Sequence, residues 1–168
     1  MTTNKKSNNK DAGNNLIFVH ASDLHLDSPF IGLSEINPQL SDVMSKATFV
    51  AYNNIIDLCI ERNADFLLIS GDIYDSADKS LYAQLKFLEG LKRLSAAGIP
   101  AYITHGNHDP LNGWSASLDW PENVKVFSGD DVETVPIEKN GNVVAYINGI
   151  SYRTRHIQEN LAKRFQKK

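Results

Sequence analysis

The sequence predicts an α/β fold in which helices wind a parallel sheet. Three short apolar runs, at residues 16–19, 66–69 and 101–103, are typical of buried strands, and two stretches with helical spacing of apolar residues separate them. Strand, helix, strand, helix, strand is the order that right-handed crossovers need to build a parallel sheet. A polar cluster follows each run, so we expect the three clusters to meet at one edge of that sheet.

The two connections each predict one amphipathic helix. Apolar residues recur three and four positions apart over 40–59, and leucines do the same over 81–94. Asp78 is placed to cap the second helix and Gly98 to end it. The first run, at 16–19, predicts a strand that is buried on both faces.

After Pro121 the pattern changes to short β-branched segments. The runs at 124–127, 132–137 and 143–147 predict strands, and Asn140-Gly141 between the last two predicts a tight hairpin turn. Residues 157–165 predict the start of a basic terminal helix.

The ends of the chain are basic and its body is acidic. The net charge is −3, but Lys and Arg are in excess over 1–15 and 153–168, which leaves 16–152 strongly negative. Such a body is a poor general binder of nucleic-acid phosphates and indicates either bound cations or a solvated acidic surface. Residues 1–15 have too few apolar side chains to repay the entropy of ordering and are expected to be a disordered tail.

Cysteine usage and hydropathy favour the cytoplasm. Cys59 is a single cysteine and can form no internal disulfide, which favours a reducing compartment. No apolar stretch reaches the roughly 18–20 residues of a membrane span, and 1–15 lacks the apolar region of a secretory signal. We therefore expect a cytoplasmic protein without membrane contact, folded as one domain over residues 16–168.

The three polar clusters differ in what each indicates alone. They are Ser22-Asp23-Leu24-His25, Gly71-Asp72-Ile73-Tyr74-Asp75 and Gly106-Asn107-His108-Asp109. An Asp-x-His pattern is expected by chance about 0.4 times in this composition, and Gly-Asn-His-Asp only about 0.002 times. An aspartate after a strand is often a turn or helix cap, yet all three clusters in order at strand ends favour one metal site.

The order of the motifs resembles the calcineurin-like metallophosphoesterase superfamily, which is marked by D-x-H, G-D-x-x-D and G-N-H-D. The sequence around them, at 19–27 and 104–110, is most similar to the bacterial DNA repair exonuclease branch, of the SbcD and YhaO types. The resemblance covers about residues 16–160. It implies the first half of the family's α/β sandwich, a β-α-β-α-β unit followed by a short β-hairpin region.

The resemblance also implies site residues. The expected metal ligands are Asp23, His25, Asp72 and Asn107. They would hold two divalent cations, expected to be Mn²⁺ with Mg²⁺, Fe or Zn²⁺ as alternatives, and Asp72 would bridge them. Two such ions activate water and stabilise the entering and leaving oxygens during attack on phosphorus. His108 would protonate the leaving oxygen, and Asp109 would orient His108.

Four nearby side chains are open to other interpretations. Asp75 is a turn stabiliser, a hydrogen-bond partner of a ligand, or a substitute for the histidine that some nuclease relatives have there. His105 and His20 lie on or beside the predicted buried strands and are expected to be structural. His156 is expected to be a surface histidine.

Aromatic and basic residues offer possible contacts to nucleic acid. Trp114 and Trp120 could stack on a base, although packing of their long loop is the favoured use. A basic terminal group could touch a nucleic-acid backbone or be a solvated helix end. This group is Arg153, Arg155, Lys163, Arg164, Lys167 and Lys168.

The sequence departs from the family in its later histidines. The family completes its site with histidines well beyond Gly-Asn-His-Asp, whereas here His156 alone follows His108. We therefore expect a metallophosphoesterase domain over 16–168 that is truncated before the C-terminal histidine motifs. Such a domain should bind one ion well and hydrolyse DNA slowly.

The implied function is metal-dependent phosphodiester hydrolysis, as a DNA exonuclease of a repair system. One alternative is a non-catalytic module that binds DNA or a partner. Another is a small-molecule phosphatase or cyclic-nucleotide phosphodiesterase, because the same metal core serves all of these. The resemblance implies an ATPase subunit as a possible partner, and an uncovered sheet face favours poor solubility or a homodimer.

Overall fold

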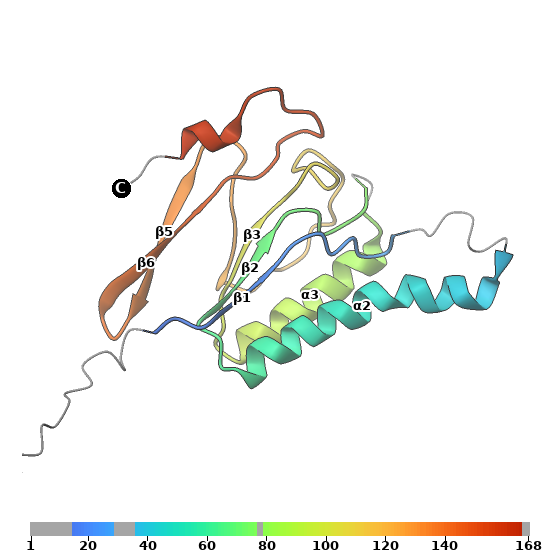
Figure 1. The fold of residues 1–168 in the computed structure, drawn as a ribbon, viewed down its shortest axis with the longest axis horizontal. Coiled ribbons are helices and arrows are strands. Elements are labelled where there is room, and N and C mark those ends of the chain that lie inside the picture. Colours follow the sequence, from blue (N-terminus) through green and yellow to red (C-terminus); the bar gives the residue numbers. More distant parts are fainter. Residues whose placement is uncertain (1–14, 29–35, 77–78, 166–168) are drawn as a thin grey trace, which may run out of the picture.

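The computed structural model describes residues 15–28, 36–76 and 79–165, without the side chains at 38, 41, 42 and 45. Two helices lie side by side against one face of a parallel sheet, and an antiparallel hairpin lies on the side away from them (Figure 1). The predicted α/β architecture is confirmed. Apart from Asn15, the tail predicted over 1–15 lies outside the described residues.

The main sheet has four parallel strands in the order β1-β2-β3-β4. These are β1 (Phe18–Ala21), β2 (Phe66–Ser70), β3 (Ala101–Thr104) and β4 (Val124–Val126). Helix α2 (Pro38–Glu61) connects β1 to β2, and α3 (Leu81–Ala96) connects β2 to β3. The predicted β-α-β-α-β order is therefore confirmed, and β4 joins the sheet beside β3 after an irregular segment.

Side-chain caps begin both helices. The Asn37 side chain accepts a hydrogen bond from Leu40 N (3.0 Å) at the start of α2, and Ser80 Oγ accepts from Ala83 N (3.0 Å) at the start of α3. The predicted cap Asp78 lies outside the described residues, and Ser80 has that role instead. Neither helix of the described residues is long and apolar enough to cross a membrane.

The hydrophobic core lies between the sheet and the two helices. Its buried members include Tyr52, Ile56, Leu67, Ile69, Phe87, Leu91, Leu94, Ala101 and Ile103. Phe87 is fully buried, with its ring centroid 5.2 Å from that of Tyr52 and 5.9 Å from that of Tyr74. Cys59 is also fully buried, and burial raises the pKa of its thiol to about 11, so that it stays protonated.

The first strand differs from the prediction of burial on both faces. β1 is an edge strand, and Ile17 and Phe18 are each 51% exposed. The Phe18 ring stacks on Phe66 at a centroid distance of 5.1 Å, but the helices cover the opposite face of the sheet. A continuous apolar run is compatible with either position, and it is β2 that is mostly buried.

The predicted hairpin is confirmed. β5 (Glu133–Lys139) and β6 (Asn142–Gly149) pair in antiparallel fashion around Asn140-Gly141. The φ angles of 55° and 74° at these two residues are the left-handed values that a tight hairpin turn requires. Ion pairs from Lys125 to Glu133 (2.6 Å) and from Lys139 to Asp65 (2.8 Å) connect β5 to the main sheet.

The helix predicted over 157–165 is wrong in extent. The segment forms a single 3-10 turn, η1 (Leu161–Arg164). The Asn160 side chain accepts a hydrogen bond from Ala162 N (3.1 Å) and so begins the turn only there. Asparagine is more favourable at such a capping position than inside a helix.

Candidate metal centre

Three loops meet at the carboxyl ends of β1, β2 and β3. Backbone bonds continue the β1–β2 pairing past the strand ends, because Asp23 N donates to Gly71 O (3.2 Å) and His25 N donates to Asp72 O (3.1 Å). The third loop joins them through His108 N, which donates to Asp72 Oδ1 (3.0 Å). The three polar clusters therefore lie together at one edge of the sheet, as the strand order requires.

Three of the expected ligands have left-handed backbone conformations. The φ angles are 54° at Asp23, 42° at His25 and 51° at Asp72. For residues with a side chain this conformation costs about 1–2 kcal/mol each, and it persists only where the surroundings hold it. Such residues cluster at functional sites, so the backbone supports a site here independently of the side-chain types.

Two glycines allow the loops to touch. A Cβ atom on Gly106 would overlap Asp72 Oδ1 and lie 2.7 Å from Asp72 N. A Cβ atom on Gly71, whose φ is +83°, would lie 3.0 Å from Gly106 Cα. Backbone meets backbone at this point, and any side chain would separate Asp72 from the third loop.

Replacing Gly106 with alanine should therefore displace the Asp72 carboxylate. We expect the free energy of unfolding to fall by roughly 1–3 kcal/mol, as for other overpacked sites, and Mn²⁺ binding to weaken. Urea unfolding and Mn²⁺ titration would measure the two effects. Gly141→Ala is the control: it strains a left-handed residue in open space and should leave Mn²⁺ affinity unchanged. Equal metal affinity in wild type and Gly106→Ala would contradict the close approach.

One group of side chains at this edge has the composition of a metal site. Asp23, His25 and Asp72 each offer a ligand atom, and these atoms lie within 4.8 Å of one another. Asp23 is exposed, whereas His25 and Asp72 are half-buried. Carboxylate oxygens with one imidazole nitrogen suit divalent cations such as Mn²⁺, Fe²⁺ and Zn²⁺, so the residues fit a divalent metal.

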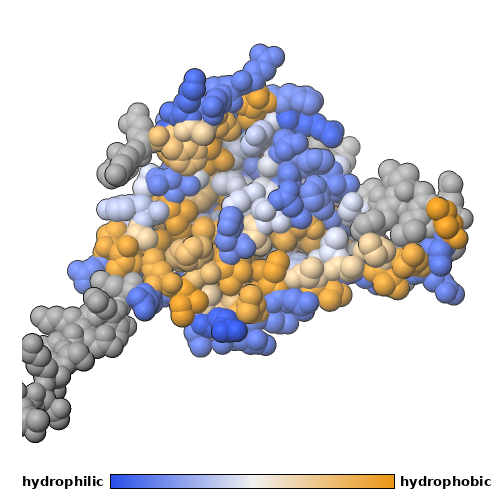
Figure 2. Space-filling view, in the orientation of Figure 1, coloured by the Kyte–Doolittle hydropathy of each residue, from blue (hydrophilic) through white to orange (hydrophobic). Residues whose placement is uncertain are grey.

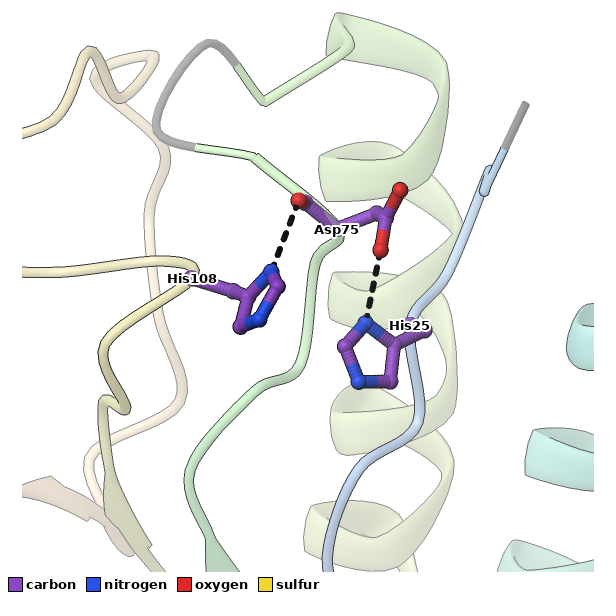
Figure 3. A group of neighbouring side chains, drawn as sticks. All are labelled: His25, Asp75 and His108. Atoms are coloured by element: carbon purple, nitrogen blue, oxygen red, sulfur yellow. Dashed lines mark hydrogen bonds and ion pairs between the residues drawn. The ribbon is translucent and has the colours of Figure 1, made fainter. Parts of the chain in front are cut away.

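A second group shares His25 with the first and is drawn in Figure 3. Asp75 Oδ1 lies 2.9 Å from His25 Nδ1, and the Asp75 carbonyl oxygen lies 3.2 Å from His108 Nδ1. The two imidazole rings are nearly perpendicular, with centroids 5.1 Å apart. Asp75 thus contacts both histidines, through its carboxylate and its main chain. Because Asp75 engages Nδ1 of His25, Nε2 is the nitrogen left for a metal.

The bond from His108 to Asp75 fixes where the ring carries its proton. A carbonyl oxygen can only accept a hydrogen bond, so His108 Nδ1 is the donor and bears hydrogen. In the neutral ring, Nε2 then has the free lone pair. Adding a proton at Nε2 gives an imidazolium ion that can release this proton to another oxygen.

Asp109 has a different place from the expected one. Its carboxylate is fully buried, accepts from Gly106 N (2.8 Å) and lies 3.0 Å from His105 Nδ1. The expectation that Asp109 orients His108 thus differs from the structure, where Asp75 contacts that ring. From this buried position Asp109 stabilises its own loop and contacts His105. His105 is only 9% exposed, which agrees with the structural role expected for it.

A buried lysine lies under the same loops. Lys79 is only 4% exposed, and its Nζ lies 5.6 Å from the centroid of the Tyr74 ring. Burial lowers the pKa of Lys79, and the negative charge of Asp109 opposes this shift. Burial also raises the pKa of Tyr74, with a further contribution from Asp109. No sequence signal marks a loop lysine as buried, so sequence reasoning missed Lys79.

Asn107 and the two tryptophans have separate surroundings. Asn107 is half-buried and lies between Gly106 and His108, both of which contact Asp72. Trp120 packs edge to face on Phe87 at a centroid distance of 6.0 Å, which favours the loop-packing interpretation. Trp114 is 54% exposed on the same loop.

Besides His105, two further histidines lie outside both ligand groups. His20 is exposed on β1, and its Nε2 lies 2.7 Å from Ser70 Oγ, so the predicted buried surroundings are wrong for this residue. His156 is exposed in the segment before η1, as predicted.

Comparison with known proteins agrees with the arrangement of the motifs. A family model described as calcineurin-like phosphoesterase matches residues 16–167. The chain belongs to this family. Members are metallophosphoesterases, so the α/β sheet with two helices and a hairpin is the N-terminal part of a known enzyme fold.

Several curated proteins are similar to this chain in sequence. The uncharacterized metallophosphoesterase YhaO of Bacillus subtilis is 40% identical over 152 residues, which are 90% of this chain and 37% of that protein. DNA double-strand break repair protein Mre11 of Methanococcus maripaludis is 35% identical over 92 residues, 55% of this chain and 23% of that protein. Mre11 of Thermoplasma acidophilum is 28% identical over 129 residues, 68% and 32% respectively. The chain therefore spans well under half the length of these relatives.

Proposed function

We propose that this metallophosphoesterase chain takes part in hydrolysis of DNA phosphodiester bonds as an exonuclease. The observation that carries the proposal is the group Asp23, His25 and Asp72, which lies beside a histidine, His108, whose ring is oriented by a carbonyl. Similarity to proteins named for DNA double-strand break repair supports DNA as the substrate.

Asp23, His25 and Asp72 would hold a divalent cation, for which we propose Mn²⁺. Asn107 would add an amide oxygen, because its two neighbours in the chain both contact Asp72. A bound cation supplies Lewis-acid chemistry: it neutralises charge on the phosphodiester and makes water more acidic. Asp75 would keep the His25 ring in the orientation and tautomer that leave Nε2 available.

His108 would act as the general acid. The oxygen of water adds to phosphorus and its proton passes to solvent, the bond from phosphorus to the leaving oxygen breaks, and that oxygen takes the proton from His108 Nε2. The Asp75 carbonyl keeps Nδ1 protonated during this transfer, so Nε2 is the nitrogen that exchanges its proton. Asp109 would act as a positioning residue, since it holds Gly106 and the loop that carries His108.

The test is nucleotide release from linear DNA that is labelled at one end. We expect slow release that needs Mn²⁺, stops with a chelator and resumes when Mn²⁺ is restored, while closed circular DNA stays intact. An Asp23→Asn variant purified in the same way would reveal contaminating nuclease. Release that survives chelation, or equal cutting of circular DNA, would contradict the proposal. Tight Mn²⁺ binding without any release would favour the non-catalytic module.

A further inference from the structure

The segment that follows β6 is held against the loop that carries His108. Tyr152 N donates to His105 O (3.0 Å), Leu111 N donates to Tyr152 O (2.9 Å) and Asn112 N donates to Arg153 O (3.1 Å). Ser151 is fully buried, and its hydroxyl accepts from His105 N (3.0 Å). Hydrogen bonds therefore hold together two segments that are far apart in the sequence.

This segment brings basic side chains to the edge of the sheet where the metal ligands lie. Arg153 and Arg155 are exposed, and Arg164 of η1 donates to the carbonyl oxygen of Asp130 (2.7 Å). We use the name basic rim for Arg153, Arg155, Lys163 and Arg164. Figure 2 shows mainly hydrophilic surface over the loops at this end of the sheet, while apolar residues gather toward the other end.

Arg153 is built into the rim. Its stem packs on Gly129, where a Cβ atom would overlap Arg153 Cγ, and its Nη1 lies 2.7 Å from Asp130 Oδ1. A hollow of about 300 Å³ is lined by Leu111, Asn112, Ser128, Gly129, Asp130 and Arg153. The Arg153–Asp130 pair is exposed, so exchanging it for an anionic ligand costs little. Arg155 has no hydrogen bond or ion pair among the described residues.

The rim lies within reach of a strand bound at the metal ligands. Asn112, which bonds to Arg153, is four residues from His108, and four residues span at most about 14 Å. Phosphates follow one another at roughly 3.4 Å per strand along a nucleic-acid helix, so this span covers about four nucleotides. Arginine presents several donors to phosphate oxygens in a planar fork.

We propose that Arg153 and Arg155 bind phosphates of the DNA strand whose reacting phosphodiester lies at the metal ligands. This subsite rests on the proposed nuclease function, because it takes the same substrate. It would give an acidic chain local positive charge for DNA, although Asp130 pairs with Arg153 and Glu159 pairs with Arg164 in the free protein.

The test is the salt dependence of binding to a labelled single-stranded oligodeoxynucleotide, measured by fluorescence anisotropy in a chelator so that no cleavage occurs. Each lost phosphate contact should lower the slope of log affinity against log salt by about 0.7. We expect a decrease of about 1.4 for Arg153→Gln/Arg155→Gln and of about 0.7 for Arg155→Gln alone. Arg155→Gln alone removes no contact within the fold, so its slope can be interpreted even if the double variant is unstable.

Arg62→Gln is the matched control, because Arg62 is exposed at the end of α2, where the chain enters β2 at the opposite edge of the sheet. Its slope should equal that of wild type. Unchanged slopes in both rim variants, or an equal loss in Arg62→Gln, would overturn the subsite. Hydrolysis of a small phosphodiester by the wild type is measured separately. Its absence would contradict the proposed function, while the slopes would still decide whether the rim binds DNA.

Discussion

Replacing Asp72 with asparagine should lower the Mn²⁺ affinity of the chain by more than roughly 100-fold. Loss of a residue that only supports a ligand typically costs 10–100-fold, and Asp72 is a proposed ligand. Asparagine keeps the shape and the oxygen that accepts from His108 N, so the loops should stay in place. Isothermal titration with Mn²⁺ measures the change. Asp57→Asn is the matched control: Asp57 is half-buried on α2, pairs with Arg93 and belongs to neither ligand group, so this variant should bind Mn²⁺ as wild type does.

Thermal melts give a second reading of the same variant. Mn²⁺ at 100 times its dissociation constant should stabilise the wild type by about 2.7 kcal/mol, and this gain should vanish in Asp72→Asn. Without metal, the variant should melt no lower than wild type, because removing one of two nearby carboxylates relieves repulsion from Asp23. A wild-type Mn²⁺ shift that persists in the variant would show that Asp72 is not a ligand.

The helices and the sheet follow from short-range patterns, but their exposed faces do not. The leucine pattern over 81–94 predicts α3, and Leu91 and Leu94 are fully buried as expected. Leu81 and Leu85, on the same pattern, are 51% and 47% exposed. Periodicity marks an apolar stripe along a helix, whereas burial depends on how much of that stripe the sheet reaches. The exposed apolar run of β1 has the same explanation.

The grouping of Asp23, His25 and Asp72 follows from strand ends alone, because parallel strands bring their carboxyl ends to one edge. The contacts around these three side chains cannot be predicted from the strand ends. The family resemblance implies that Asp109 orients His108, yet the Asp109 carboxylate accepts from Gly106 N, and the His108 ring donates to the Asp75 carbonyl oxygen of another loop. Which group contacts His108 depends on the directions of the loops, and the residue types at single positions do not determine these directions.

Backbone conformation is the signal that sequence reasoning lacked. Left-handed φ angles at Asp23, His25 and Asp72 come from the bonds between neighbouring loops. Aspartate and histidine tolerate this conformation better than most residues, but their spacing in the sequence does not predict it. The contacts of Asp75 with two histidines likewise need three loops in register, which only the assembled sheet provides.

His108→Ala should separate chemistry from metal binding. General acid catalysis contributes typically 10²–10⁴-fold, so we expect Mn²⁺-dependent hydrolysis of a small phosphodiester to fall by about that factor. The bond that joins this residue to Asp72 uses the main-chain nitrogen, which alanine retains. Mn²⁺ affinity should therefore stay within a few-fold of wild type, in contrast to Asp72→Asn.

The control for His108→Ala is His156→Ala, since His156 is an exposed histidine outside both ligand groups and should leave the rate unchanged. A more activated leaving group needs less help from a proton, so the loss in His108→Ala should shrink as the leaving group becomes more acidic. A loss that is the same for all leaving groups would assign His108 a structural role. A parallel loss of Mn²⁺ affinity would make it a ligand through the second group, with His25 and Asp75.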